Sequence, residues 1–350
     1  MPTLLKTKSI YFNDVNLIQQ IGKVRSRKDV PKELYRIICS PMTALIGPVF
    51  AVKAAQLGLS ITIPRSKFLG LEKKVEIYKS FNTETGVEIF PNNKQLCFMG
   101  IGPNEPENNI SYLNTIVNSK SFLVDMANGT IPQIQECLQK IYNITGQIEN
   151  LMIGNVMTSL GLDYLYRKLL LTGICKNLFV RIGTGNGSAC KTSDEVGINR
   201  GQITELFECN EKKLFIRDGL GCQSLNIVSD GGISKPGFAV KAFGAGSDYV
   251  LMGGYFVNSF EAETHISGDG TYFGCASERQ NKLDGLDKHS EGKERIVDKI
   301  ELKPLEEIVK QLWGGISSAV SYSGVSNLTD FVGNGVFEEK CNSLPPKKRY

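Results

Sequence analysis

Short, nearly continuous apolar segments alternate with longer polar stretches along most of the chain. Each segment is rich in branched residues and is soon followed by Gly, Pro, Ser or Asn. The eight segments span residues 35–39, 59–63, 95–99, 122–125, 149–153, 178–182, 226–229 and 248–252. Apolar runs of about five residues are typical of parallel strands that are covered on both faces. The pattern therefore predicts eight buried parallel strands.

Several of the intervening stretches have the spacing of amphipathic helices. The predicted helices span residues 49–57, 131–142, 158–171, 202–209 and 236–243. Pro236 suits a first helical turn, and Gly244 suits the residue just past a helix end. Eight strand–helix units favour an α/β fold of the (β/α)8 or TIM barrel type. A doubly wound open sheet is the alternative that periodicity leaves open.

Two polar stretches interrupt the alternation. Residues 193–202 follow the sixth predicted strand, and residues 265–294 form a long insertion after the eighth that is rich in Gly, Lys, Asp and Ser. Long connections without a regular pattern are usually functional lids or disordered segments. We expect one catalytic barrel domain over residues 1–350, with a mobile flap at about 265–294 and a tail at about 338–350. No inserted domain or internal repeat is evident.

Composition places the chain among ordinary globular proteins, because 41% of its 350 residues are hydrophobic and 22% are charged. No apolar run approaches the roughly 20 residues of a membrane span, and the first residues lack the pattern of a secretory signal. These features predict a cytoplasmic protein that does not bind membranes. The net charge of +4 is not gathered on one segment, apart from a short basic stretch at 347–349, so nucleic-acid binding is not expected.

The cysteine and histidine counts limit which catalytic and metal sites the chain can form. Nine cysteines are scattered singly and never as a CxxC pair, which fits neither a disulfide framework nor a zinc ribbon. Only His265 and His289 are present, so a site built from several imidazoles is disfavoured. Cysteine is therefore a better candidate for a nucleophile than a histidine-activated serine.

A glycine-rich loop follows the sixth predicted strand directly. Residues 183–192 read GTGNGSACKT, and alternate glycines let a backbone approach a ligand closely. The loop reaches Cys190, with hydroxyls at Ser188 and Thr192 on either side. A thiol at the carboxyl end of a barrel strand lies where barrel enzymes place catalytic groups. The alternative is that Cys190 is a small buried packing residue.

Two further glycine pairs close the last two predicted strands. Asp230 precedes Gly231 and Gly232, and Gly253 and Gly254 follow the eighth strand. In this fold the loops after strands seven and eight recurrently bind phosphate. Their amides and the start of the helix near residue 236 would bind a phosphate dianion, and Asp230 would accept hydrogen bonds from a ribose diol. The alternative is two tight turns that need glycine only for geometry.

The chain resembles the family of IMP dehydrogenases and GMP reductases, barrel enzymes that form a covalent thioimidate between a loop cysteine and C2 of a purine nucleotide. Matching segments occur in family order over nearly the whole chain. They are YFNDV (11–15), SR (26–27), SPM (40–42), VDMANG (124–129), GNV (154–156), IGTGNGSACKT (182–192), SDGG (229–232), PGFAVKAFGAGSDYVLMGG (236–254), YFG (272–274), SEGK (290–293) and LWGGISSAVSYSG (312–324).

The resemblance implies a role for each matching residue. Cys190 would be the nucleophile, and Thr192 with Glu291 would transfer the proton. The residues implied to bind the purine nucleotide are Ser40, Met42, Ser188, Asp230, Gly231, Gly232, Gly253, Gly254, Tyr272, Gly274, Cys275, Ala276, Lys288, Ser290 and Gly292. Those implied for the nicotinamide cofactor are Ser26, Arg27, Arg65, Asp125, Met126, Ala127, Thr184, Gly185, Ser318 and Ser321. Potassium is implied at Gly185, Gly187, Cys190 and Ser193, and the family resemblance also implies a homotetramer.

Within this resemblance the chain is closer to the reductases. Dehydrogenases usually carry a pair of regulatory modules (CBS domains) in the barrel and a flap with an Arg-Tyr dyad, and neither feature is found here. The reading is therefore a reductase that converts GMP to IMP and ammonia with NADPH. The alternatives are an IMP dehydrogenase that uses NAD and a nucleotide-binding protein with little activity. The chain departs from the family pattern at Thr43, Lys191, Cys275 and Lys288, and at residues 64–67.

Overall fold

A computed structural model describes residues 8–84, 94–187, 192–267, 269–287, 289–290 and 292–340. Eight parallel strands close into a barrel, in which each strand pairs with the next along the chain and the last pairs with the first. They are β2 (Ile37–Cys39), β3 (Ser60–Ile63), β4 (Cys97–Ile101), β5 (Ser121–Asp125), β6 (Ile148–Val156), β7 (Cys175–Ile182), β8 (Leu225–Asp230) and β9 (Tyr249–Met252). All eight predicted strands and the barrel itself are confirmed.

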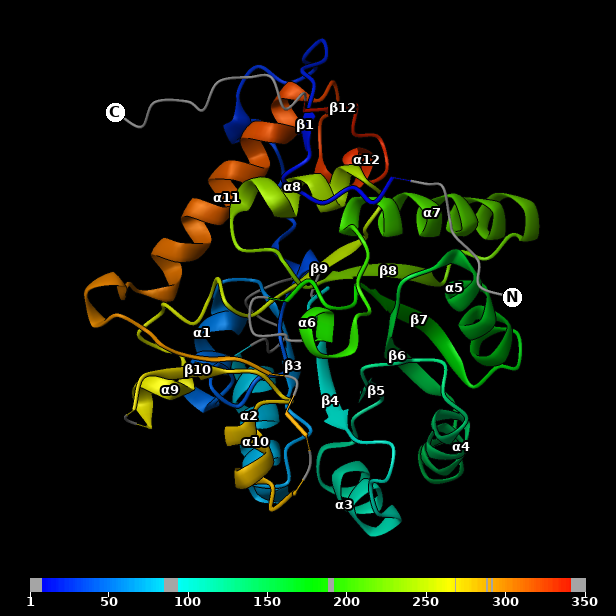
Figure 1. Cartoon of the computed structure of the whole chain (residues 1–350), viewed down its shortest axis with the longest axis vertical. Coiled ribbons are helices and arrows are strands. Elements are labelled where there is room, and N and C mark those ends of the chain that lie inside the picture. The colour runs from blue at the N-terminus through cyan, green and yellow to red at the C-terminus, as the bar shows by residue number, and fades with distance from the viewer. Residues whose placement is uncertain are drawn as a thin grey trace.

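A helix follows every barrel strand and covers its outer face (Figure 1). The main helices are α1 (Pro48–Gln56), α2 (Gly70–Glu84), α3 (Glu107–Val117), α4 (Gln133–Thr145), α5 (Ser159–Leu165), α7 (Gln202–Leu214), α8 (Pro236–Gly244) and α11 (Leu305–Tyr322). The five predicted helices correspond to α1, α4, α5, α7 and α8. The predicted helix over 158–171 is α5 continued by the wider turn η3 (Tyr166–Leu170), and α7 is likewise continued by η4 (Phe215–Gly219).

The barrel interior is filled by side chains. One buried cluster takes a single residue from each of seven strands: Ile38, Phe98, Leu123, Met152, Phe179, Val228 and Leu251. The residues on either side of them in the strands, such as Ile37 and Cys39, belong to the larger core between strands and helices. Because side chains alternate across a strand, the small cluster is the inward-facing set. The interior is therefore packed, and a ligand can bind only at an end of the barrel.

The end of α8 corrects one detail of the sequence reading. Gly244 is the last residue of the helix and not the residue beyond it. A Cβ there would lie 3.0 Å from the Phe331 ring and 3.3 Å from the Gly335 Cα, so glycine is needed for close packing of the C-terminal segment. The left-handed residue that lets the chain leave the helix is Gly246, whose φ is +106°.

The long insertion after β9 is folded against the carboxyl end of the barrel. We call residues 263–296 the flap. It contains α9 (Glu263–Ile266), α10 (Glu278–Leu283) and the antiparallel strands β10 (Thr271–Phe273) and β11 (Glu294–Ile296). The other predicted connection, 193–202, begins within the short helix α6 (Thr192–Val196).

The two ends of the described chain meet away from the flap. Strand β1 (Val15–Leu17) pairs antiparallel with β12 (Phe337–Glu339), beside α12 (Leu328–Phe331) (Figure 1). Three short turns of helix complete the described structure: η1 (Arg27–Asp29), η2 (Leu34–Arg36) and η5 (Lys299–Glu301). Among the described residues, no helix is long and apolar enough to cross a membrane.

Candidate functional site

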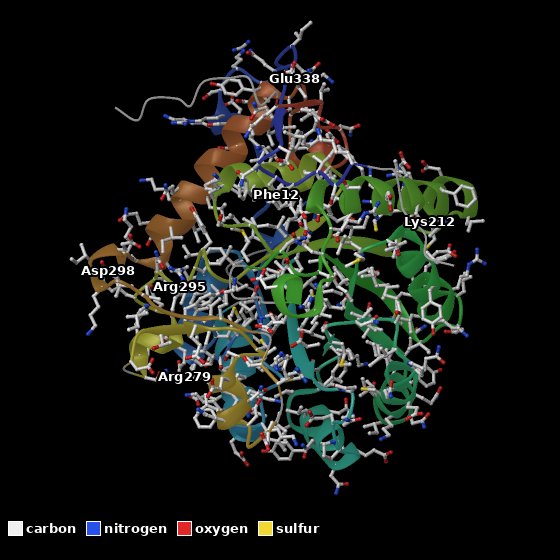
Figure 2. All side chains as sticks on the ribbon, in the orientation of Figure 1. Phe12, Lys212, Arg279, Arg295, Asp298 and Glu338 are labelled. Atoms are coloured by element: carbon white, nitrogen blue, oxygen red, sulfur yellow. The ribbon has the colours of Figure 1, made fainter. Side chains whose placement is uncertain are left out.

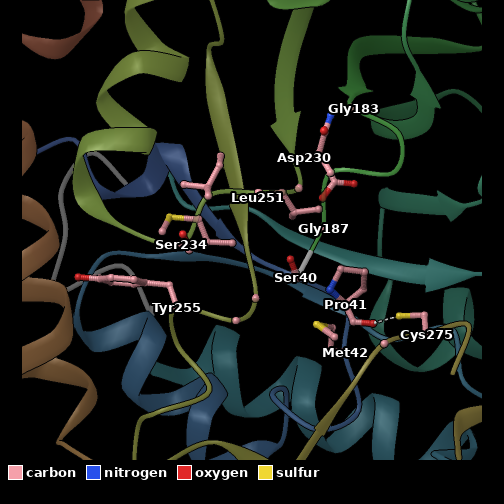
Figure 3. A pocket seen from close by; sticks show the side chains of 18 of the residues that line it. Ser40, Pro41, Met42, Gly183, Gly187, Asp230, Ser234, Leu251, Tyr255 and Cys275 are labelled. Carbon is pink, nitrogen blue, oxygen red and sulfur yellow. Dashed lines mark hydrogen bonds between the residues drawn. The ribbon is translucent and has the colours of Figure 1, made fainter. Parts of the chain in front are cut away.

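A cavity of about 1120 Å³ opens at the carboxyl ends of the barrel strands. Its wall combines the ends of β5, β7, β8 and β9 with the flap (Figure 3). The predicted site residues that line it are Ser40, Met42, Arg65, Asp125, Met126, Ala127, Thr184, Gly185, Gly187, Asp230, Gly231, Gly232, Gly253, Gly254, Tyr272, Gly274, Cys275, Ala276 and Gly292. Segments far apart in the sequence therefore meet in one cavity, because parallel strands of a closed barrel all end at the same edge.

The floor of the cavity is a buried charge network centred on Arg181 of β7. Its guanidinium donates to Asp125 Oδ1 at 2.6 Å from Nη1, and to Asp230 Oδ2 at 3.0 and 2.8 Å from Nε and Nη2. Arg65 Nε donates to the other oxygen of Asp125 at 3.2 Å. Only 9–15% of the Arg181, Asp125 and Asp230 side chains is exposed. Arg181 thus ties together the last residues of β5 and β8.

The network keeps its groups charged. Burial alone raises the pKa of Asp125, but the nearby Arg181 and Arg65 outweigh it, and the pKa is lowered below its ordinary value. Burial likewise works against the charge of Arg181, and the two carboxylates more than offset it, so its pKa is raised. Asp125 is therefore a carboxylate acceptor at neutral pH.

Asp230 offers one oxygen to the cavity. Its Oδ2 accepts three hydrogen bonds, two from Arg181 and one from Asn155 Nδ2 at 2.8 Å. Within the described residues, no hydrogen bond reaches Oδ1. The donors hold the carboxylate in one orientation and leave Oδ1 free to accept from a ligand hydroxyl.

The glycines beside Asp230 leave no space for a side chain. Gly183 has a φ of +130°, and a Cβ there would lie 2.1 Å from the Asp230 carbonyl oxygen. A Cβ on Gly253 would lie 2.8 Å from Met42 Sδ and 3.2 Å from Tyr272 Oη. The backbone amides at these turns can therefore approach an anion closely.

One part of the cavity wall is less polar than the rest. Burial raises the pKa of the Cys275 thiol to about 12, so the thiol stays protonated and donates to the Pro41 carbonyl oxygen at 3.0 Å (Figure 3). Met42 and Ala276 line the same side. This wall suits a flat, largely apolar ligand group, while the floor and the glycine turns suit hydroxyls and an anion.

Other predicted residues lie elsewhere or outside the described residues. Ser26, Arg27, Ser318 and Ser321 do not line the cavity: Arg27 Nη1 donates to Ser318 Oγ at 3.2 Å on the surface between η1 and α11. Ser193 lies in α6, and Ser290 Oγ donates to the Ala276 carbonyl oxygen at 3.3 Å. Ser188, Cys190, Lys288 and Glu291 fall outside the described residues. Thr192 is the first residue of α6, and its side chain is not described.

Sequence reasoning missed several lining residues, among them Arg181, Asn155 and Arg295. A usable signal existed for two of them. Arg181 interrupts the apolar run LFVRI, and a charge inside a buried strand requires an ionic partner at the same level of the barrel. Asn155 likewise interrupts the apolar run LMIGNVM, whereas Arg295 lies in an ordinary polar context and carried no comparable signal.

The described residues fit the implied cofactor and cation. The cavity exceeds the roughly 300–1,000 Å³ of an ordinary ligand pocket, so a nucleotide leaves room beside Asp125, Met126 and Ala127. The loop of Gly185 packs closely against the loop of Ile198, because a Cβ on Gly185 would lie only 2.9 Å from the Ile198 carbonyl oxygen. Backbone carbonyl groups of two loops therefore lie near each other. Backbone carbonyls suit a hard monovalent cation such as potassium. Within the described part of the chain, no three His, Cys, Asp or Glu side chains gather as metal ligands.

Comparisons with known proteins agree with this geometry. The family model for the IMP dehydrogenase / GMP reductase domain matches residues 18–344. A GMP reductase of Caenorhabditis elegans is 26% identical over 96% of this chain and 93% of its own length. GMP reductase 2 of Mus musculus is 28% identical over 99% of this chain and 98% of its own. A GMP reductase of Aeromonas salmonicida is 28% identical over 83% of this chain and 82% of its own.

Proposed function

The chain belongs to the IMP dehydrogenase/GMP reductase family, and on that premise we propose that it is a GMP reductase. The family's enzymes are oxidoreductases that bind purine nucleotides and use a nicotinamide cofactor. The proposed reaction is the reductive deamination of GMP to IMP and ammonia with NADPH. Three relatives named GMP reductase, each matched over more than four fifths of both chains, support the reductase over the dehydrogenase.

One observation carries the proposal. A single cavity brings together the free Oδ1 of Asp230, the glycine turns and the less polar wall of Met42 and Cys275. A nucleoside monophosphate has the matching three parts: a phosphate for the glycine amides, ribose hydroxyls for Asp230 and a flat base for the apolar wall.

The other proposed ligand contacts follow from this orientation of the nucleotide and from the family resemblance. We assign the 5′-phosphate to Gly232, Gly253, Gly254, Tyr272 and Ser188, and the base to Ser40, Met42, Gly274, Cys275, Ala276 and Gly292. NADPH would lie against Asp125, Met126, Ala127, Thr184 and Gly185. Potassium would be held by carbonyl oxygens of the loop that contains Gly185, Gly187 and Cys190.

The chemistry falls to the loop and flap residues. The Cys190 thiolate adds to C2 of GMP, and the C2–N bond breaks as Thr192 and Glu291 deliver a proton to the departing amine, which leaves as ammonia. NADPH, when bound, supplies a hydride to C2. The C–S bond then breaks and returns the Cys190 thiolate, so that GMP, NADPH and two protons become IMP, NADP⁺ and ammonium. Thr192 alone is a poor acid, which is why the carboxyl of Glu291 is needed.

The direct test is a panel of purine monophosphates with either cofactor. The expected result is loss of NADPH absorbance and release of ammonia with GMP, and a Cys190 adduct seen by intact mass after acid quench. Cys190→Ala should abolish both. NAD reduction with IMP would instead identify a dehydrogenase, and tight nucleotide binding without an adduct or turnover would identify a binding protein.

We further propose a homotetramer, with the surface of Ser26, Arg27, Ser318 and Ser321 at the cofactor site of a neighbouring subunit. These four residues lie together but away from the cavity of their own chain, as a shared site requires. Light scattering gives the assembly mass. Arg27→Ala is expected to raise the KM for NADPH and leave nucleotide affinity unchanged.

A further inference from the structure

Strand β11 brings an arginine to the glycine end of the cavity. Arg295 is the register partner of Tyr272 in the antiparallel pair of β10 and β11. Directly opposite residues of such a pair project from the same face of the sheet. Tyr272 is buried and lines the cavity, and its hydroxyl lies beside Gly253. Arg295 therefore faces the same space.

Two contacts define the position of the guanidinium. Its Cζ lies 5.4 Å from the centre of the Tyr272 ring, and Nη2 lies 3.5 Å from the Gly254 carbonyl oxygen, at the limit of a hydrogen bond. The ring supports the planar group on one face. The edge of the guanidinium is therefore available beside the turn of Gly253 and Gly254.

Arg295 also differs from the other cations of the cavity in its charge partners. Four of the described cations line the wall: Arg65, Arg181, Arg295 and Lys303. Arg65 and Arg181 are bonded to Asp125 and Asp230, and Lys303 Nζ donates to Glu307 at 2.7 Å. Arg295 has no carboxylate partner within the described residues. Glu301 also lines the wall, where it accepts from Asn258 Nδ2 at 3.4 Å. Arg295 is thus the described lining cation that is left without a bonded carboxylate, and it lies at the glycine turns.

We propose that Arg295 binds the 5′-phosphate of the nucleotide and makes the site selective for a phosphomonoester over an uncharged nucleoside. This inference rests on the proposed function. Glycine amides donate hydrogen bonds but bring no net charge, whereas a guanidinium adds charge and a planar fork that matches two phosphate oxygens. Binding of the phosphate would also fix the position of β11, which begins two residues after Gly292 of the base-binding wall.

The experiment compares a nucleotide with its nucleoside. Calorimetry measures GMP and guanosine binding to the full chain, to Arg295→Gln and to Arg295→Lys, with IMP and inosine as a second pair. Arg295→Gln is expected to weaken GMP binding about tenfold or more and to leave guanosine binding unchanged, the usual range for losing a charge-assisted hydrogen bond. Arg295→Lys should fall between the two, because it keeps the charge but loses the fork.

The flap supplies a matched control. Arg279 lies 5.1 Å from the Phe273 ring in the same kind of contact, but it does not line the cavity (Figure 2). Arg279→Gln should leave the GMP-to-guanosine affinity ratio unchanged. The inference is overturned if Arg295→Gln keeps the ratio of the unmodified protein. If the unmodified protein binds no purine monophosphate, both this inference and the proposed function fail together.

Discussion

The floor and the flap of the cavity both carry ion pairs, yet they hold their charges in opposite environments. The floor joins Asp125, Arg181 and Asp230 with side chains 9–15% exposed, all at the ends of barrel strands. The flap meets the rest of the protein through surface pairs such as Lys293 with Asp194, which are 49% and 68% exposed. Solvent screens the second kind and hardly reaches the first.

This contrast separates two tasks. Buried carboxylates with fixed donors can orient a ligand, because their positions follow from the strands and a neighbouring guanidinium supplies their counter-charge. Exposed pairs can form and break as a flap opens and closes. We therefore predict that the floor determines where a ligand lies and that the flap determines when the cavity is complete. Four substitutions test this division.

Removing Arg181 should have the largest effect. Arg181→Met leaves Asp125 and Asp230 buried without their main counter-charge, a change that typically costs about 3–5 kcal/mol of unfolding free energy. Nucleotide affinity should fall as well, since Asp230 loses two of its three donors. Urea unfolding and calorimetry measure the two effects. Arg181→Lys is the control and should recover part of the stability. A Met variant as stable as the parent would show that this network does not contribute to stability.

Glu205 of α7 sharpens the comparison, because it is fully buried and neither carboxyl oxygen has a hydrogen-bond partner among the residues that the structure describes. Burial raises its pKa to about 9, mainly through loss of water, with Arg200 opposing. The folded state then holds a proton that the unfolded chain releases above about pH 4.5, so stability falls as pH rises from there to about 9. Glu205→Gln removes this loss, of about 1 kcal/mol per pH unit. The measurement is unfolding at pH 6 and 8, and Glu211→Gln, exposed on the same helix, is the control.

Gln280 tests how the flap is attached. This buried side chain of α10 accepts from Thr43 Oγ1 and donates to Ser66 Oγ at 2.9 Å. Gln280→Ala should cost about 1–2 kcal/mol and raise the KM for nucleotide several-fold, because the buried Ser66 and the half-buried Thr43 each lose a hydrogen-bond partner. Differential scanning calorimetry and initial rates measure these effects. An unchanged KM would show that α10 does not help to form the cavity.

The surface pair of Lys293 and Asp194 should matter least. Lys293→Ala is expected to change the unfolding free energy by less than about 1 kcal/mol, because exposed pairs are worth little. Its effect on kcat/KM should shrink further at 0.5 M salt. Rates at low and high salt provide the measurement. A large, salt-independent loss would place this pair with the floor and remove the contrast between the two regions.

The barrel was predictable because its strands are buried on both faces, and such strands consist of nearly continuous runs of apolar residues. The helices α2, α3 and α11 were not predicted. In α11 the adjacent Gly314 and Gly315 are poor helix formers, but a Cβ on Gly315 would lie 2.6 Å from Pro236 Cβ, so glycine there serves the contact with α8. When a residue is required by a contact with another helix, the neighbouring sequence does not reveal that requirement.

The site divides in the same way. The glycine turns and Asp230 could be named from the chain itself, because each follows directly after an apolar run and a barrel edge gathers every strand end in one place. The pairing of Arg181 with two carboxylates, the free oxygen of Asp230 and the position of Arg295 over Tyr272 could not. They join residues 23 to 56 positions apart. Secondary structure follows from the local pattern of apolar and polar residues. A hydrogen-bond network between strands forms only when the barrel closes, because closure sets the distances between residues of different strands.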